Sequence, residues 1–478
     1  MFSAPVHPGW TTALLMRRLA CPSCPDFGII LRWVVVFLLS MALLMRPAAA
    51  QSILRDAETE ALLNDIARPI VIAAGLEPGN VQMILIQDKE INAFVAGGQA
   101  VYIHSGLIAA ADNVNEVQGV IAHEVGHITG GHIVRFSEGA RAATGISLLS
   151  LLLGAAVMAA GGGEAGMGIL SAGQQAAMSK FLAFTRTQES SADAAGASFM
   201  KKAGISGRGS VSFFQKLRKE EFRLSSSYAD VDPYARTHPM SADRAAVMEA
   251  ELKGDPAWNK PTDPALEARF QRVRAKLAGF VDDPKVTLAH YPESNQSIPA
   301  RYARAYAWHK AAYPDKAVAE VDKLVAVAPH DPYFLELKGQ ILLESGKPKD
   351  AIAPLREAVA TTRGAPLIAS LLGHALIATE DPANLPEART VLRNAVARDN
   401  DNPFAWYQLG IVYSQDGDIA RAALATAERY ALIGQPKLAL ANAETAMRGI
   451  PQGTPDYVKA EDIALTSRQA IEDQKKRR

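Results

Sequence analysis

The sequence predicts an α+β domain, mostly helical with a small antiparallel sheet, followed by an all-α domain of helical repeats. Short β-branched runs at 81–86 and 100–103 interrupt stretches of helical periodicity, which indicates the mixed first domain. From about residue 298 the chain is rich in alanine and its prolines recur at a regular interval, which indicates the repeats. With 478 residues, 49% hydrophobic and 21% charged, the chain has room for two or three ordinary globular domains.

Composition divides the chain into four predicted segments. Residues 1–50 are predicted to be an export signal, 51–254 the first folded domain, 255–297 a proline-containing linker and 298–478 the repeat domain. Fifty basic and fifty acidic residues cancel, so no overall field favours a polyanion. We therefore expect no nucleic acid among the partners.

The first segment has the features of a cleaved signal peptide. Arg32 precedes an uncharged run, and three alanines at 48–50 supply a cleavage site before Gln51. The uncharged run is shorter than the roughly 20 residues that a membrane-spanning helix needs. An uncleaved anchor and a true start at Met16 are the alternatives. Export is the expectation.

Both cysteines, Cys21 and Cys24, lie in this leader. Cleavage would remove them, so the mature chain could form neither disulfides nor thiolate ligands. Any metal ion in the mature chain must then be held by His, Glu or Asp side chains.

The two β-branched runs are expected to pair as an antiparallel hairpin, with Gly97-Gly98 between them as the turn. An exposed edge of such a sheet can pair with the backbone of an extended peptide. A hairpin buried in the core is the alternative, and one sheet can serve both purposes.

Residues 116–133 are predicted to form a helix that carries a metal site. His123 and His127 are four residues apart and therefore share one helical face, with Glu124 beside them in an HExxH pattern. A zinc ion held by two imidazoles lowers the pKa of a bound water toward ~7, and Glu124 would be the general base for that water.

The third protein ligand has two candidates. His132 follows in a run close to HExxHxxGxxH, but that pattern needs histidine at 133, where Ile133 stands. On a continuous helix His132 would face about 180° away from His123, so we interpret it as a surface histidine or one that supports a ligand. Glu189 is the better candidate.

Glu189 and Asp193 are four residues apart and share one helical face. Glu189 can bind the metal while Asp193 fixes a ligand histidine through a hydrogen bond. A solvated acidic pair on an exposed helix is the alternative.

Between these motifs lies a predicted helical hairpin. The segments 145–160 and 165–178 are apolar and rich in small residues, and Gly161-Gly162-Gly163 separates them. Sixteen residues fall short of a comfortable membrane span, so a buried or interface-lying hairpin is favoured over a transmembrane one. Its tip could make peripheral membrane contact through 145–178, bind a partner or cover the cleft.

After the linker, which itself contains a helical stretch at 265–278, a repeat becomes visible. Three prolines precede helices that carry glycine at the same offset, and the glycines are 34 and 37 residues apart: Pro332 with Gly339, Pro366 with Gly373 and Pro403 with Gly410. Thirty-four residues is the tetratricopeptide period.

Together these motifs resemble a known family. HEVGHITGGH at 123–132, the later ExxxD, Thr237-His238-Pro239 with Arg244 beyond it, and the repeat tail are similar to the BepA-like periplasmic metallopeptidases, relatives of HtpX. The resemblance implies a zincin-like fold and a gluzincin-type zinc endopeptidase of the periplasm. It implies His123, His127 and Glu189 as zinc ligands and Glu124 as base.

The resemblance also implies the partners. The expected substrates are unfolded or misassembled outer-membrane proteins, with the repeats docking onto the outer-membrane assembly machinery. The alternative is a chaperone or adaptor in outer-membrane protein assembly with a latent metal site, although the intact HExxH motif favours the enzyme.

His238 is predicted to act at the site, with more than one role open. It could hydrogen-bond the oxyanion of the tetrahedral intermediate, occupy the open zinc position and keep the enzyme latent, or be structural. Arg186 and Arg244 could orient carboxylates around the site or form ordinary surface ion pairs.

Overall fold

The computed structural model describes residues 52–160, 162–225, 238 and 242–476. The predicted export signal at 1–50, with its two cysteines, lies outside the described residues, as do Thr237 and Pro239. The described residues from Ser52 onward form one compact unit.

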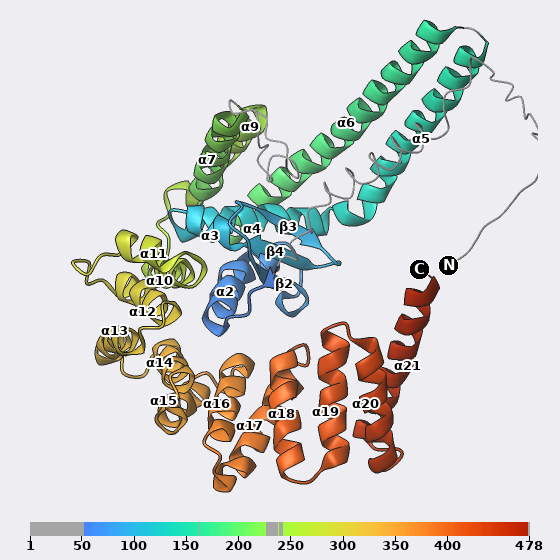
Figure 1. Ribbon diagram of the computed structural model, residues 1–478. Helices are drawn as coiled ribbons and strands as arrows, with labels where there is room; N and C mark the ends of the chain where they lie inside the picture. The colour runs from blue at the N-terminus through green and yellow to red at the C-terminus, as the bar shows by residue number, and fades with distance from the viewer. Residues whose placement is uncertain (1–51, 161, 226–237, 239–241, 477–478) are drawn as a thin grey trace, which may run out of the picture. The chain divides into compact units, whose positions relative to one another are not determined.

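The first part of this unit combines a small sheet with helices that pack on it (Figure 1). Its elements are β1 (Ser52–Ile53), α2 (Ala57–Ala73), η1 (Pro78–Asn80), β2 (Gln82–Gln87), β3 (Ala93–Ala96), β4 (Ala100–His104), α3 (Ser105–Ala110), α4 (Val114–Thr129), α5 (His132–Ala159), α6 (Gly163–Ala203), α7 (Arg208–Ser225) and α9 (Ala242–Lys253).

The second part is helical throughout its described length. Its elements are η2 (Pro256–Asn259), α10 (Pro264–Val281), α11 (Pro284–His290), α12 (Ile298–Lys310), α13 (Pro314–Val327), α14 (Pro332–Glu344), α15 (Pro348–Thr361), α16 (Pro366–Ala378), η3 (Pro382–Asn384), α17 (Leu385–Arg398), α18 (Pro403–Gln415), α19 (Ile419–Leu432), α20 (Pro436–Gly449) and α21 (Pro455–Lys476).

The sheet is mixed, with strand order β1-β2-β4-β3. Strands β2 and β4 run parallel, whereas β1–β2 and β3–β4 are antiparallel. The predicted antiparallel pairing of 81–86 with 100–103 is therefore wrong. The reason is a strand that the prediction overlooked: the chain reverses once before β3 and again at Gly97-Gly98, so β4 points in the same direction as β2. Both glycines have the positive φ that such a turn requires.

Helix α4 occupies the centre of the core. Val117, Ile121 and Val125 on this helix are fully buried, and Phe270 and Val273 of α10 join the same cluster. The helix predicted at 265–278 is thus confirmed, and the segment predicted as a linker contributes to the core. The domain boundaries themselves stay a prediction.

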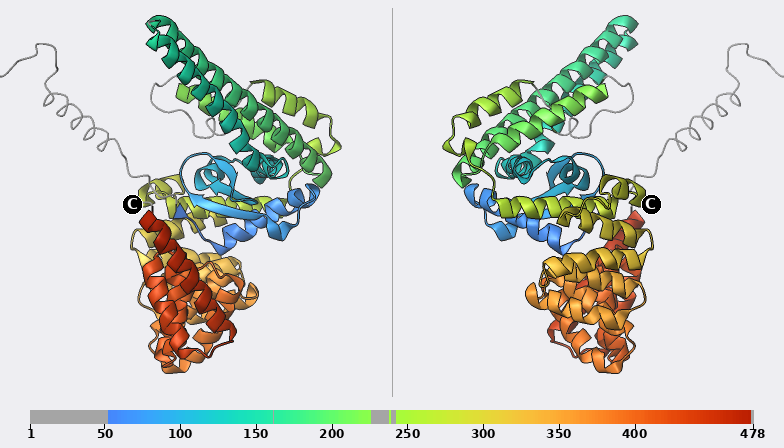
Figure 2. Two further views of the ribbon diagram at one scale, coloured as in Figure 1. Left: turned by 90° about the vertical axis from the view of Figure 1, so that its right-hand side faces the viewer. Right: turned by 90° about the vertical axis from the view of Figure 1, so that its left-hand side faces the viewer.

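The predicted hairpin is present, but its helices are longer than expected. Helices α5 and α6 run antiparallel, and their outer halves extend away from the sheet and from the other helices of the first part (Figures 1 and 2). The return helix α6 continues without a break through Glu189 and Asp193 to Ala203. A single helix therefore connects the tip of the hairpin to the predicted metal site.

The recurring glycines of the repeats lie where paired helices touch. A Cβ atom at Gly339 would be 2.4 Å from the Leu355 side chain, and one at Gly373 would be 2.5 Å from Leu392. Each leucine lies on the second helix of its pair, α15 or α17. At these two positions the absence of a side chain permits the close approach, whereas a Cβ atom at Gly410 would meet nothing nearer than 3.5 Å.

A buried group of polar side chains, here called the joint cluster, links α2 to α10, α12 and α14. It comprises Asp56, Glu58, Arg272, Lys276, Tyr302 and Glu336. The Lys276 ammonium lies 2.5 Å from Asp56 and 3.2 Å from Glu58. Tyr302 donates a hydrogen bond of 2.8 Å to Glu58. These charges are paired with one another, which is the condition for burying them.

The acid that lacks such a bond is Glu336, whose buried Oε2 atom has no hydrogen-bond partner. Burial raises the pKa of Glu336 to about 8, despite the nearby Lys276. Because the pKa is higher in the folded state, this group stabilises the fold fully below its unfolded pKa near 4.5, and the contribution is lost as pH rises through about 8.

We expect Glu336→Gln to remove this pH dependence. Relative to the variant, wild type should lose up to about 1.4 kcal/mol of unfolding free energy per pH unit within the window between the two pKa values. Urea unfolding of both proteins at pH 5, 6.5 and 8 measures the difference. Other titrating groups are common to both proteins, so parallel curves would contradict the assignment.

Candidate metal centre

Helix α4 presents the HExxH motif from the middle of the core. The Asn113 side chain caps its first turn by accepting a hydrogen bond from the backbone N–H of Glu116. His123, Glu124 and His127 are all buried. Buried polar side chains in a hydrophobic core need polar partners. Here the partners are side chains of α6 and His238.

Small residues bring α6 against α4. A Cβ atom at Gly126 would lie 2.6 Å from the Ala192 carbonyl oxygen, and one at Gly196 would lie 3.0 Å from the backbone of Ala122. The two helix backbones therefore touch, and larger side chains would separate them. This contact places Glu189 next to the two histidines, although 62 residues separate it from His127 in the sequence.

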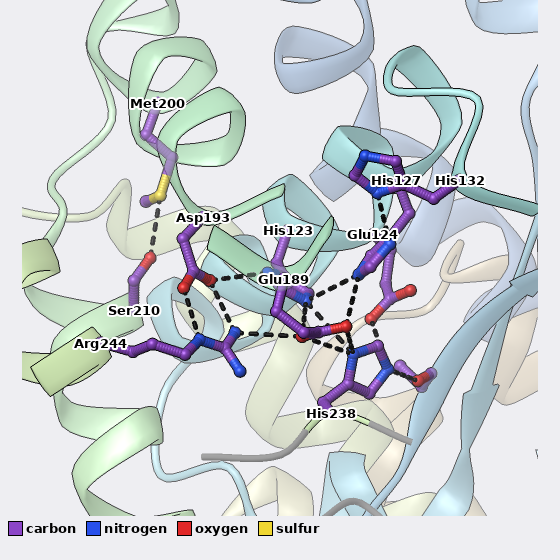
Figure 3. Close-up of polar contacts among 11 residues, drawn as sticks. His123, Glu124, His127, His132, Glu189, Asp193, Met200, Ser210, His238 and Arg244 are labelled. Atoms are coloured by element: carbon purple, nitrogen blue, oxygen red, sulfur yellow. Dashed lines mark hydrogen bonds and ion pairs between the residues drawn. The ribbon is translucent and has the colours of Figure 1, made fainter. Parts of the chain in front are cut away.

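Four donor groups converge at this point: His123, His127, Glu189 and His238 (Figure 3). The Nε2 atoms of His123 and His127 are 3.1 Å apart, and each lies 3.4 Å from a carboxylate oxygen of Glu189. The donor atoms of all four residues lie within 4.8 Å of one another, and all four residues are buried. The described chain thus brings together the three predicted ligands and His238.

The charge on these groups is set by their neighbours. Burial opposes ionisation of Glu189, yet the His238 and His123 rings hold its pKa well below its usual range. Burial disfavours a charged His123, but hydrogen bonds to Asp193 and Glu189 raise its pKa to about 10. Burial and the adjacent His123 lower the pKa of His127 to about 2. The site therefore provides an ionised carboxylate and a neutral imidazole.

Asp193 fixes the orientation of His123. The His123 Nδ1 atom lies 2.9 Å from Asp193, which leaves Nε2 pointing at the other donors. Arg244 donates two hydrogen bonds to Asp193, at 2.7 and 2.9 Å, and lies 3.1 Å from Glu189. Arg244 is buried and orients both carboxylates, whereas Arg186 is exposed. Of the two arginines that the sequence suggested, only Arg244 reaches the site.

Glu124 faces the same space without a hydrogen bond. Its side chain is fully buried, and neither carboxylate oxygen has a hydrogen-bond partner. Burial raises its pKa, against the effect of His238 and His123. Buried carboxylates are normally satisfied, so this one fits a site that holds a metal ion and a water molecule. The four nitrogen and oxygen donors beside it have the chemistry of a metal site.

His238 bridges the donors and the sheet. Its Nδ1 atom lies 3.3 Å from Nε2 of His123 and 3.1 Å from Glu189, while Nε2 lies 3.2 Å from the backbone oxygen of Ala93 at the start of β3. Nε2 is also 3.6 Å from Glu124. The segment that contains Ala93 is one of those that carry the family resemblance, but the sequence assigned Ala93 no role at the site, because a backbone carbonyl leaves no residue-type pattern.

His132 also contacts the site: its predicted direction is wrong, but the contact agrees with one of the two roles left open for it, that of a histidine that supports a ligand. The prediction that it would face away assumed a continuous helix, but α4 ends at Thr129 and Gly131 adopts a φ of 62°. This turn brings the His132 ring back, with its Nδ1 atom 2.9 Å from Nδ1 of His127. The residue is buried and holds the side of His127 that faces away from the other donors.

We expect His132→Ala to weaken metal binding by about 10–100-fold, the usual effect of removing a partner that orients a ligand histidine. His132→Asn, whose side chain can also hydrogen-bond His127, should restore part of the loss. Competition with a chromophoric chelator measures the affinity directly. An unchanged affinity in the alanine variant would show that His127 does not need this contact.

Different known families match the first part of the chain and the repeats. Residues 54–252 match peptidase family M48, and residues 300–366 and 373–439 match tetratricopeptide repeats. The chain has an M48 peptidase domain and tetratricopeptide repeats. The resemblance inferred from the motifs is confirmed at this level, and the M48 domain contains all the donors described above.

Several curated proteins are similar over most of the chain. The Beta-barrel assembly-enhancing protease of Yersinia pestis is 26% identical over 379 residues, covering 78% of this chain and 76% of that protein. The protein of the same name from Escherichia coli K12 is 25% identical over 399 residues, covering 82% and 79%. The metalloprotease LoiP of the same strain is 33% identical over 171 residues, covering 35% and 61%.

Solved structures are similar to the repeat part. MamA is 21% identical, with a TM-score of 0.28, and the match covers 36% of this chain and 96% of MamA. YrrB, a protein with tetratricopeptide repeats, is 20% identical with a TM-score of 0.31, and the match covers 37% and 92%.

Proposed function

We propose that this protein is a zinc-dependent endopeptidase of the cell envelope that cleaves unfolded or stalled outer-membrane proteins in the periplasm. The observation that carries the proposal is the convergence of His123, His127 and Glu189 around a space that the Glu124 carboxylate, which accepts no hydrogen bond, also faces. Two imidazoles and a carboxylate match the ligand set of catalytic zinc sites. The names of the relatives supply the substrate class.

Each residue has a role in the proposed reaction. Zinc bound by these donors would supply Lewis acidity for the scissile carbonyl and lower the pKa of bound water. Glu124 accepts a proton from the attacking water and returns it to the leaving amine, and its raised pKa suits both steps. Asp193 holds His123 with Nε2 toward the ligand position, and Arg244 keeps both carboxylates in place.

The outer edge of β3 is the proposed position of the substrate backbone. Strand β3 pairs with β4 alone among the described strands, so its other edge can add an extended peptide. His238 now bonds the Ala93 oxygen on that strand and stands among the metal donors. In this arrangement His238 occupies the fourth donor position, which supports the latent role over the oxyanion role.

The repeats are proposed to dock partners from the outer-membrane assembly machinery. A cavity of about 1120 Å³ lies between the first part and the repeats, lined on one side by α2 and β2 and on the other by Leu367, Ser370 and Phe404. Strand β1 pairs with Ile86 and Gln87 of β2, and the Leu54 N–H donates to the Leu85 carbonyl oxygen. Among the described strands, the edge of β2 that lines the cavity is therefore open from Gln82 to Ile84. An extended segment of a partner could pair there.

Proteolysis of an unfolded outer-membrane β-barrel protein tests the proposal. The chain from Gln51 should cut it when zinc-loaded, stop when the metal is removed by a chelator and resume when zinc is restored. The same barrel, refolded in detergent, is the matched control and should resist. If zinc-loaded and stripped protein both leave the substrate intact and suppress its aggregation equally, the adaptor alternative replaces the enzyme.

A further inference from the structure

The hairpin has an outer part that the proposed chemistry does not use. We define the outer arm as the described residues of 142–179, in α5 and α6. Between Arg141 and Lys180 its single charged residue is Glu164, near the tip. Helix α5 is the described helix that is long and apolar enough to cross a membrane, and only 11% of its most apolar window is buried. A core helix would be mostly buried, so this helix requires another explanation.

The outer arm buries its small residues and exposes its large ones. Gly154 of α5 packs against Gly166 of α6, and Ser150 packs against Gly173. Ser150, Gly154, Gly166 and Ala177 are buried. Five leucines on α5 are instead more than half exposed: Leu148, Leu149, Leu151, Leu152 and Leu153. A water-soluble helical hairpin buries its large apolar side chains between the helices and exposes polar ones. Helices in membranes instead pack against one another through small residues.

The leucines form a continuous surface. At about 100° per residue they cover an arc of about 200° on the side of α5 opposite Ser150 and Gly154. Helix α6 has a mixed outer side: Gln175 lies about 180° from the buried Gly166, next to the exposed Met167 and Met178. The arm is therefore amphipathic as a pair of helices, with an apolar α5 face and a more polar α6 back.

Arg141 and Lys180 flank the outer arm and lie at nearly the same height along it. A Cβ atom at Gly139 would meet Phe184 and one at Gly173 would meet Ser150, which fixes the register of the two helices. In this register Arg141 and Lys180 lie within about two residues of each other along the arm. The hydroxyl of Thr144 is bonded inside its own helix, to the Ala140 carbonyl, so it does not need water.

We propose that the outer arm lies in the interface of a phospholipid bilayer, with the leucine face of α5 among the acyl chains and Arg141 and Lys180 beside the lipid phosphates. The uncharged part of α5 is about 27 Å long, at the lower limit for a membrane span, whereas that of α6 is about 22 Å, short of the ~30 Å hydrocarbon core that the returning helix would also have to cross. Because Glu164 and Gln175 also resist full burial, the arm lies in one leaflet and does not span. The arm leaves and returns on the same side, so the metal site stays on that side.

Site-specific fluorescence tests the proposal without using enzymatic activity. The chain from Gln51 has no cysteine, so a single introduced cysteine can carry an environment-sensitive dye. Leu152→Cys and Gln175→Cys place it on opposite sides of the arm, and Val327→Cys places it on exposed α13. With vesicles of phosphatidylethanolamine and phosphatidylglycerol at 3:1, we expect a several-fold rise at Leu152, quenched by nitroxides on the acyl chains. The rise should be smaller at Gln175 and absent at Val327.

Flotation with the same vesicles provides the loss-of-binding test. The pair Leu149→Glu and Leu152→Glu should abolish flotation, whereas the matched pair Val327→Glu and Ile419→Glu, also on exposed apolar residues, should leave it unchanged. Circular dichroism checks that all variants fold. Reversing the charges of Arg141 and Lys180 should weaken binding to the anionic vesicles more than to phosphatidylcholine.

Two results would overturn the membrane assignment. One is a Leu152 dye that does not respond to vesicles, together with flotation that survives the leucine changes. The other is self-association without lipid: if sedimentation shows a dimer that the same leucine changes dissociate, a second copy of the chain covers the leucine face instead.

Discussion

Replacement of Glu124 by glutamine is expected to lower kcat for peptide hydrolysis by about 10²–10⁴-fold, the usual contribution of a positioned general base. Glutamine has nearly the same shape but cannot accept the proton. Metal affinity should change little, because Glu124 is not among the four converging donors. Steady-state kinetics on an unfolded substrate and a chelator titration, done on the same preparation, measure both quantities.

A matched control lies two turns earlier on the same helix. Glu116 is also buried, but it accepts hydrogen bonds from Ser212 and Lys216 and does not face the metal donors. Glu116→Gln should reduce stability while leaving kcat per metal-loaded molecule unchanged. A Glu124→Gln enzyme that retains more than a tenth of wild-type kcat would show that the base is another group.

Loss of Lys276 is expected to cost about 3–5 kcal/mol of unfolding free energy, as is usual when one partner of a buried ion pair is removed. Lys276→Met fills a similar volume but leaves Asp56 without its cation and Glu58 with Arg272 alone. The lysine is 3% exposed, so water cannot replace it. Urea unfolding at pH 7 measures the effect.

An exposed lysine supplies the comparison. The Lys323 side chain is 54% exposed and lies 3.8 Å from Glu320, so Lys323→Met should cost less than about 1 kcal/mol. Adding Asp56→Asn to Lys276→Met should recover part of the loss, because the carboxylate that Lys276→Met leaves without a cation disappears. If the two single changes were simply additive, the coupling assigned to the joint cluster would be absent.

Helical spacing alone was enough to group the metal donors on their own helices. His123 and His127 share one face of α4 because they are four residues apart, and the same spacing pairs Glu189 with Asp193 on α6. Spacing could not say that the two faces meet. That depends on the backbone contacts at Gly126 and Gly196, which arise only when the hairpin folds back.

Local breaks in regular structure account for what the sequence did not predict correctly. The prediction that His132 faces away assumes a helix that continues through Gly130-Gly131. The chain leaves the helix there, and the turn redirects the His132 ring. The sheet was predicted as antiparallel because the short strand β3, with only four residues, was overlooked. In both cases the chain changes direction at a point where the sequence pattern suggests that it continues.

The length of α6 has a mechanical consequence. One unbroken helix of 41 residues carries Met167 and Met178 in the outer arm and Glu189 nearer its other end. Because no break in the helix separates the outer arm from Glu189, a force that tilts the arm acts on the whole of α6. The helix would then pivot about its contact with α4 at Ala192. A tilt of the outer arm would therefore move the Glu189 carboxylate relative to the two imidazoles on α4.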